Sequence, residues 1–172
     1  MLAKAVVYVK YKLIIFDLDG TIWDHEDVSS LTPLFRKISK NTIVDLRGTL
    51  VKLYPYVKET LSKLKQMGFI LAIVSWNKEK IALEALDAFG LAGLFDYYCI
   101  EYHPYKEKMI KKILKKIYEE ENEIKSFQVI YIDDRDIHIK DIAREVSGIY
   151  FIHMWIDVKN YKDLLKLIKT IT

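Results

Sequence analysis

The chain has 172 residues, with 27 lysine and arginine residues against 24 aspartate and glutamate residues, so its formal net charge is +3. Hydrophobic residues make up 51% of it, which is enough for the core of one domain, and we expect a single domain over residues 1–172. The small charge excludes a dedicated nucleic-acid binder, and the lack of an apolar run of ~20 residues excludes a membrane span.

The N-terminal segment 1–12 is apolar and dotted with lysines, but it has no small-residue cleavage site and leads directly into a strand-like run. We therefore interpret it as structure rather than as a signal peptide. The single cysteine, Cys99, lies in a Tyr-Tyr-Cys-Ile run that is typical of a buried strand. No intramolecular disulfide can form, and a reducing cytoplasm is the compartment that we expect.

Strand-like and helical patterns alternate along the chain. Short apolar runs predict buried strands at 13–16, 69–74, 96–100, 127–132 and 149–153. Apolar residues at helical spacing predict helices at 57–67, 78–88, 106–121, 137–145 and 161–171. This alternation predicts an α/β fold of three layers, in which helices cover both faces of a Rossmann-like parallel sheet.

One segment, at about residues 24–54, interrupts the alternation. It starts as a polar loop and continues into two β-type runs around Arg47-Gly48, a pattern typical of a hairpin. The hairpin follows the turn after the first strand, so we expect a small flap that can cover the site. A plain extension of the sheet is the alternative.

Polar residues follow the three strongest predicted strands. Asp17 and Asp19 come after the first, Ser75 after the second, and Asp133 with Asp134 after the third. Ligands of parallel sheets bind beyond the carboxyl ends of the strands. We therefore expect these side chains to gather at one edge of the sheet.

These residue types meet the demands of phosphate monoester chemistry. A carboxylate can attack phosphorus and form an aspartyl-phosphate when Mg²⁺ shields it from the charge of the substrate. Asp17 and Asp19 lie two residues apart and point the same way along an extended chain, while Gly20 permits a tight turn towards an anion. Lys106 adds fixed positive charge, and Ser75 adds a hydroxyl donor.

The Asp-Leu-Asp-Gly-Thr run at 17–21 resembles the first motif of the haloacid dehalogenase superfamily of phosphatases. A serine after a strand, a lysine opening a helix and an acidic pair after another strand then follow in the order of that superfamily. Trp23, the Arg47-Gly48 turn and the Leu-Tyr-Pro-Tyr-Val run at 53–57 resemble its magnesium-dependent phosphatase family, over about residues 12–155. Members of that family lack a large cap domain, which agrees with the short insert.

The resemblance implies a role for each acidic residue. Asp17 would be the nucleophile and a direct Mg²⁺ ligand. Asp19 would be the general acid and base, with its backbone carbonyl on the metal. Asp134 would complete the protein ligands, and Asp133 would lie near the metal or reach it through a water molecule.

The resemblance also implies a phosphate site. Ser75 and Lys106 would hold the phosphoryl oxygens, and we include Trp76 and Asn77 among the expected phosphate-binding residues. The Trp76-Asn77 pair differs from the pair that the family often has. Core packing is the default expectation for both Trp23 and Trp76, and contact at the edge of the substrate is the alternative. The lysine motif offers two residues. We prefer Lys106 because a hydrophobic residue then follows four positions on, and Lys108 is the alternative.

The expected function is hydrolysis of phosphate monoesters through an aspartyl-phosphate, with Mg²⁺ as the cofactor. A phosphotyrosine protein or a phosphosugar is the expected substrate, because a site without a large cap is open to either. The alternatives are a non-catalytic interaction module on the same fold and a phosphatase acting on nucleic-acid ends, although we do not expect a nucleic-acid partner.

Overall fold

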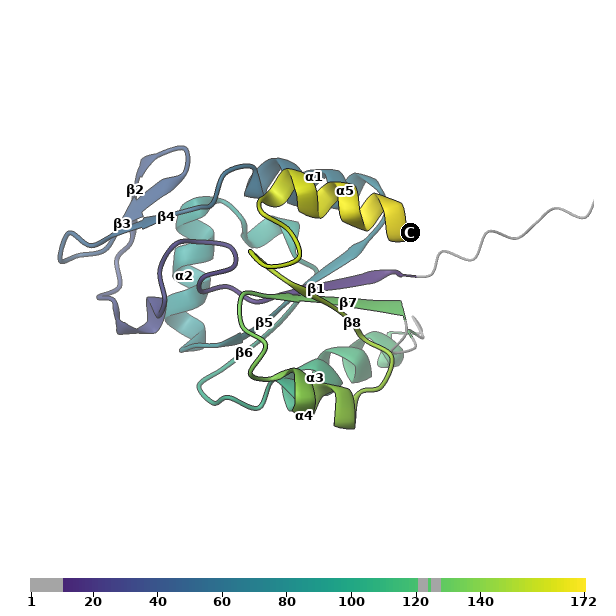
Figure 1. Ribbon diagram of the computed structural model, residues 1–172. Helices are drawn as coiled ribbons and strands as arrows, with labels where there is room; N and C mark the ends of the chain where they lie inside the picture. Colours follow the sequence, from purple (N-terminus) through teal and green to yellow (C-terminus); the bar gives the residue numbers. More distant parts are fainter. Residues whose placement is uncertain (1–10, 121–123, 125–127) are drawn as a thin grey trace, which may run out of the picture.

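The computed structural model describes residues 11–120, 124 and 128–172. Its central sheet contains five strands: β1 (Leu13–Phe16), β5 (Ile70–Trp76), β6 (Tyr97–Glu101), β7 (Val129–Asp133) and β8 (Tyr150–His153). They are parallel and lie in the order β6-β5-β1-β7-β8, so that β1 is central (Figure 1). The carboxyl end of β1 therefore lies between those of β5 and β7.

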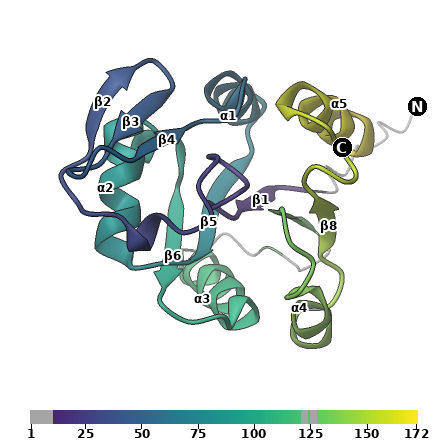
Figure 2. The same cartoon turned by 60° about the vertical axis from the view of Figure 1, so that its left-hand side comes forward.

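Helices cover both faces of the sheet (Figures 1 and 2). One face carries α1 (Val57–Gln66), α2 (Glu79–Phe89) and α5 (Tyr161–Ile171), and the other carries α3 (Lys106–Glu119) and α4 (Ile139–Glu145). Ile14 and Phe16 of β1 pack in the core of the first face, and Leu13 and Ile15 pack in that of the second. Because successive strand residues point to opposite faces, β1 must be apolar throughout. The predicted three-layer α/β fold is confirmed.

The predicted elements match the observed ones closely within the described residues. The interpretation of the segment before Tyr11, and the predicted element ends at 121 and 127, lie outside those residues. The main difference is β5, which continues through Ser75 to Trp76, so that Ser75 lies inside the strand. None of the helices in the described parts of the chain is both long and apolar enough to cross a membrane.

The insert contains one more strand than predicted. A 3₁₀ helix, η1 (Val28–Ser30), precedes three antiparallel strands, β2 (Arg36–Ser39), β3 (Thr42–Val44) and β4 (Leu50–Lys52). β3 and β4 form the predicted hairpin. β2 escapes prediction because all four of its residues are exposed, so its sequence lacks the alternation of a half-buried strand.

Two carboxylates brace the insert. Glu84 of α2 accepts hydrogen bonds from the backbone N–H groups of Leu34 and Phe35, and buried Asp45 accepts hydrogen bonds from three backbone N–H groups at 2.7–3.0 Å.

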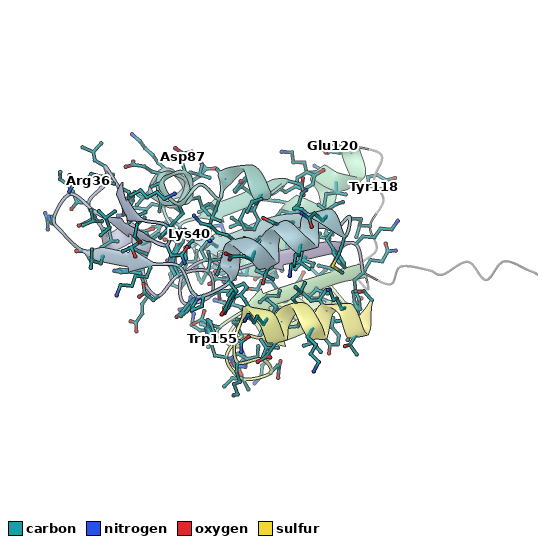
Figure 3. The ribbon with its side chains drawn as sticks, turned by 90° about the horizontal axis from the view of Figure 1, so that it is seen from above. Arg36, Lys40, Asp87, Tyr118, Glu120 and Trp155 are labelled. Atoms are coloured by element: carbon teal, nitrogen blue, oxygen red, sulfur yellow. The ribbon has the colours of Figure 1, made fainter. Side chains whose placement is uncertain are left out.

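The insert and the end of α3 lie at opposite ends of the molecule. In Figure 3, Arg36 of the insert is at one end, and Glu120, which follows α3, is at the other. The first turn of α3 therefore points to the same end as the insert.

Candidate active site

A buried lysine at the start of α3 forms ion pairs with two aspartates, one just after β1 and one at the end of β7. Asp17 follows β1, and its backbone N–H donates to Ile132 of β7 at 2.9 Å. Lys106, the first residue of α3, donates to Asp17 Oδ1 at 2.6 Å and to Asp133 Oδ2 at 2.7 Å. All three side chains are almost completely buried. Lys108, the alternative lysine, is exposed and lies over the ring of Tyr105 at 4.2 Å.

The carboxylates around Lys106 form a group that fits a divalent cation. Oxygen atoms of Asp17, Asp133 and Asp134 lie within 4.8 Å of one another. Asp17 Oδ2 is buried and has no hydrogen-bond partner among the described residues, which is costly unless another group satisfies it. Carboxylate oxygens are the ligands that Mg²⁺ prefers in proteins. These residues therefore fit the magnesium site expected from the sequence.

The electrostatics of the group are dominated by burial. Burial raises the pKa of Asp17 to about 7, the charge of Lys106 opposes this rise, and the charge of Asp133 adds to it. Burial and the charge of Asp133 likewise raise the pKa of Asp134. Burial would also raise the pKa of Asp133, but the ion pair with Lys106 lowers it overall. The single positive charge of Lys106 thus offsets only part of the negative charge that the three carboxyl groups carry when ionised. A bound cation would offset the rest.

Gly20 brings the loop after β1 against Asp134. Its φ is +69°, and a Cβ at this position would lie 2.5 Å from Asp134 Oδ2. Thr21, the next residue, donates from Oγ1 to Asp134 Oδ1 at 3.2 Å and accepts from the Asp134 N–H at 3.0 Å. The glycine is therefore required both by its backbone conformation and by the carboxylate that faces it.

We expect Gly20→Ala to weaken magnesium binding at least tenfold, because the new methyl group must displace the Asp134 carboxylate. Isothermal titration with MgCl₂ measures this. Gly90→Ala is the matched control: Gly90 has a φ of +71°, and a Cβ there meets nothing within 4 Å. Both variants should lose about 1 kcal/mol of unfolding free energy to backbone strain. Equal magnesium affinity in the two variants would contradict the proposed contact.

Asp19 lies beside this group and has its own set of donors. Its Oδ1 accepts from the Trp23 indole N–H at 2.6 Å and from the Val28 N–H at 3.2 Å, and its Oδ2 accepts from Asn77 Nδ2 at 2.7 Å. Burial raises the pKa of Asp19, and the hydrogen bonds from Trp23, Asn77 and Val28 partly offset this. A carboxyl group with a raised pKa that also borders a cavity is suited to proton transfer.

The other predicted phosphate-binding residues lie around the end of β5. Ser75 is 1% exposed, and its Oγ accepts from Asn77 Nδ2 at 3.0 Å. Asn77 is fully buried, and its side chain also contacts Asp19 and the Ser29 hydroxyl. Trp76 points outward and is 40% exposed. Asn77 thus contacts Asp19 directly and links it to Ser75, whereas Trp76 lines the smaller of two cavities that border Asp19.

Two neighbouring cavities of about 190 and 360 Å³ open beside Asp19. Their shared walls are formed by Asp19, Glu26, Asp27 and Arg135. The smaller cavity is also lined by Trp76 and Tyr102, and the larger by Gly20 and Asp134. A ligand in these cavities therefore approaches the carboxylate group from the side of Asp19 and Asp134. The strands of the insert line neither cavity. Within the insert region, only Glu26 and Asp27 contribute to the cavity walls.

Two positioning contacts were not predicted from the sequence. Trp23 was expected to pack in the core, and it does stack on Phe89 at 5.9 Å between ring centroids, but its indole N–H also holds Asp19. Trp155 donates to the Gly20 carbonyl at 2.7 Å from the segment that precedes α5 (Figure 3). The only sequence signal for the hydrogen bond from Trp23 to Asp19 is the position of Trp23 close after the first motif. Nothing in the sequence indicates the hydrogen bond from Trp155 to Gly20.

Comparison with known proteins identifies related phosphatases. A family model described as Acid Phosphatase matches residues 10–162. The human protein named Magnesium-dependent phosphatase 1 is 33% identical over 144 residues, which are 83% of this chain and 77% of the human protein. The family match spans the strand ends and all of the predicted site residues.

Solved structures show the same fold. The N-terminal part of a Bacteroides fragilis protein, which contains a phosphatase domain and was complexed with Mg, has a TM-score of 0.62 at 19% identity and covers 95% of this chain, which spans 40% of that structure. A 3-deoxy-D-manno-octulosonate 8-phosphate phosphatase from Moraxella catarrhalis has a TM-score of 0.57 at 21% identity, over 95% of this chain and 89% of that one. The chain therefore belongs to the acid phosphatase family and, within it, to the magnesium-dependent phosphatases that its sequence resembles.

Proposed function

We propose that this magnesium-dependent phosphatase hydrolyses phosphate monoesters through an aspartyl-phosphate on Asp17. The observation that carries the proposal is the arrangement of two carboxylates of different kinds. Asp17 is buried against Lys106, with one oxygen free of hydrogen bonds from the described residues. Asp19 is held by three donors and lines the cavities. The first suits attack on phosphorus, and the second suits proton transfer.

In the first step an Asp17 oxygen attacks phosphorus, and the bond between phosphorus and the ester oxygen breaks. The Asp19 carboxyl group donates its proton to the leaving oxygen, so that an alcohol departs. In the second step Asp19, now ionised, takes a proton from water while the water oxygen attacks phosphorus. The bond to Asp17 breaks, inorganic phosphate is released, and both carboxylates return to their starting state.

The remaining residues bind and orient. Asp17, Asp134 and the Asp19 backbone carbonyl would hold Mg²⁺, with Asp133 beside it. The bound metal supplies positive charge that offsets the charge of the phosphoryl group. Lys106 provides a second positive charge, fixed between Asp17 and Asp133. The Ser75 hydroxyl oxygen accepts from Asn77, so its proton would be free to go to a phosphoryl oxygen.

The cavity walls favour phosphotyrosine as the substrate. Trp76 and Tyr102 expose their rings on the smaller cavity, next to Asp19. Aromatic surfaces of this kind stack on an aromatic leaving group, whereas a sugar needs a set of polar groups for its hydroxyls. A nucleic-acid end is disfavoured, because Glu26 and Asp27 would repel its neighbouring phosphates. A non-catalytic module is not favoured either, since it has no need of the buried Asp17–Lys106 pair.

A substrate panel tests the proposal. With MgCl₂ we expect phosphate release from 4-nitrophenyl phosphate and from a phosphotyrosine peptide, loss of activity with excess EDTA, and recovery with excess Mg²⁺. Trp76→Ala should raise the KM for the peptide about 2- to 12-fold, the range expected for one lost ring contact, and should leave the KM for a hexose phosphate unchanged. No metal-dependent release from any substrate would overturn the proposal. A preference for the hexose phosphate would overturn the phosphotyrosine assignment alone.

A further inference from the structure

We infer that Ser29, in η1 of the insert, is a positioning residue that fixes the orientation of Asp19 through the side chain of Asn77. The inference rests on the proposed function, because it concerns the residue proposed as the general acid and base. Ser29 is 3% exposed and lines neither cavity, so it does not contact a substrate there. Its effect on catalysis must pass through its neighbours.

The direction of each hydrogen bond around Ser29 is determined by its partners. The backbone N–H of Lys78 donates to Ser29 Oγ at 2.6 Å, so this oxygen acts as an acceptor there. The Ser29 hydroxyl proton must then go to a different acceptor, and the neighbouring polar atom is the side-chain oxygen of Asn77. A hydroxyl that donates cannot face an amide NH₂ group favourably, because both would be donors.

This hydroxyl therefore sets which way the Asn77 amide faces. With its oxygen towards Ser29, Asn77 presents its NH₂ group to Asp19 Oδ2 at 2.7 Å and to Ser75 Oγ at 3.0 Å. The reversed amide would place its oxygen against the Asp19 carboxylate, where two acceptors repel each other. Without Ser29, the described contacts leave the amide oxygen without a donor and reduce the cost of reversal.

η1 acts on Asp19 from two directions. The N–H of Val28, the residue before Ser29, donates directly to Asp19 Oδ1 at 3.2 Å, while Ser29 acts on Oδ2 through Asn77. The Asp27 side chain caps η1 by accepting from the Ser29 N–H at 3.0 Å. The first turn of the insert thus acts on both oxygens of the proposed acid.

The dependence of the rate on the leaving group distinguishes this role from a purely structural one. The quantity to measure is kcat/KM, which reports formation of the aspartyl-phosphate. 4-Nitrophenolate leaves without a proton, whereas an alkoxide needs one from Asp19. For Ser29→Ala we expect kcat/KM to fall on the order of tenfold with an alkyl phosphate, as for one misdirected buried hydrogen bond, and less than about twofold with 4-nitrophenyl phosphate.

Two further variants complete the test. Ser30→Ala is the matched control, because Ser30 belongs to the same η1, is exposed, and donates only to the Asp27 carbonyl at 2.7 Å. It should behave as wild type with both substrates. In the Asp19→Asn background, Ser29→Ala should have no further effect on kcat/KM. Ser29→Thr keeps the hydroxyl and should restore most of the alkyl phosphate activity.

The outcomes separate the inference from the proposed function. If wild-type protein shows no magnesium-dependent turnover, the proposed function is overturned and this inference with it. If wild type is active and Ser29→Ala lowers kcat/KM equally for both substrates, or lowers neither, this inference alone is overturned. Should Ser29→Ala unfold, as judged by its melting temperature, the pair of Ser29→Thr and Ser30→Ala decides. Selective loss with alkyl phosphates in Ser29→Thr, where the hydroxyl is retained, would contradict the inference.

Discussion

Asp17→Asn should lower phosphatase activity on the order of 10⁴-fold or more, as expected when the nucleophile of a covalent mechanism is removed. The amide retains the shape of the carboxylate but not its charge or its reactivity. Steady-state phosphate release from 4-nitrophenyl phosphate measures the loss. A transient phosphoprotein, trapped by acid quenching of wild type with labelled substrate, should be absent from the variant.

The same variant should remain folded. Burial raises the pKa of Asp17 from 3.8 to about 7, so its folded form holds a proton more tightly than its unfolded form. This contribution to stability is lost as pH rises through about 7, where ionisation opposes folding. The metal-free variant at pH 8 should therefore be at least as stable as wild type, while MgCl₂ should stabilise it less than wild type. Asp87→Asn, on the exposed side of α2, is the control. Normal activity in Asp17→Asn would refute the assignment.

Lys106→Met should cost both stability and activity. It leaves two buried carboxylates, Asp17 and Asp133, without their shared cation, and breaking a buried pair in this way costs about 3–5 kcal/mol. We expect urea denaturation without magnesium to show this loss. Added Mg²⁺ should recover part of it, because a bound cation again balances the carboxylates. Turnover should fall at least about 100-fold, since a charge fixed beside the reacting group is lost.

Lys108→Met is the matched control for this change. The two lysines lie two residues apart on α3, and both were candidates for the phosphate-binding role. Because Lys108 is exposed, its removal should change the free energy of unfolding by less than about 0.5 kcal/mol and leave turnover unchanged. Loss of activity in Lys108→Met together with an active Lys106→Met would reverse the assignment of the two lysines.

Much of the fold could be predicted because its signals are local. β1 and α5 were predicted with their observed ends, since a four-residue apolar run and a regular helical stripe need no tertiary information. The meeting of Asp17 with Asp133 and Asp134 also followed from the sequence, because residues after neighbouring parallel strands share one edge. Family membership confirms the resemblance on which the enzyme class and its Mg²⁺ cofactor were predicted, while the role of each residue stays a prediction.

The hydrogen-bond network around Asp19 could not be predicted, for physical reasons. Ser29 and Asn77 lie 48 residues apart in segments without periodicity, and a serine or an asparagine in such a segment is usually a turn residue. The role of Trp23 was ambiguous because burial of its ring and donation from its indole N–H both suit a position close after Asp17. β2 lacked a pattern because no part of it is buried.

The contacts of the loop after β1 have a consequence for how the enzyme matures. Trp155 holds the Gly20 carbonyl across 135 residues of sequence, and Tyr161 holds the Thr21 carbonyl across 140. Synthesis of β1 precedes that of both neighbouring strands, β5 and β7, and that of Trp155 and Tyr161. A chain emerging from the ribosome therefore cannot complete the contacts of the loop after β1 until residue 161 has left the exit tunnel. Nascent fragments should be inactive, and the onset of phosphatase activity should mark the completion of folding.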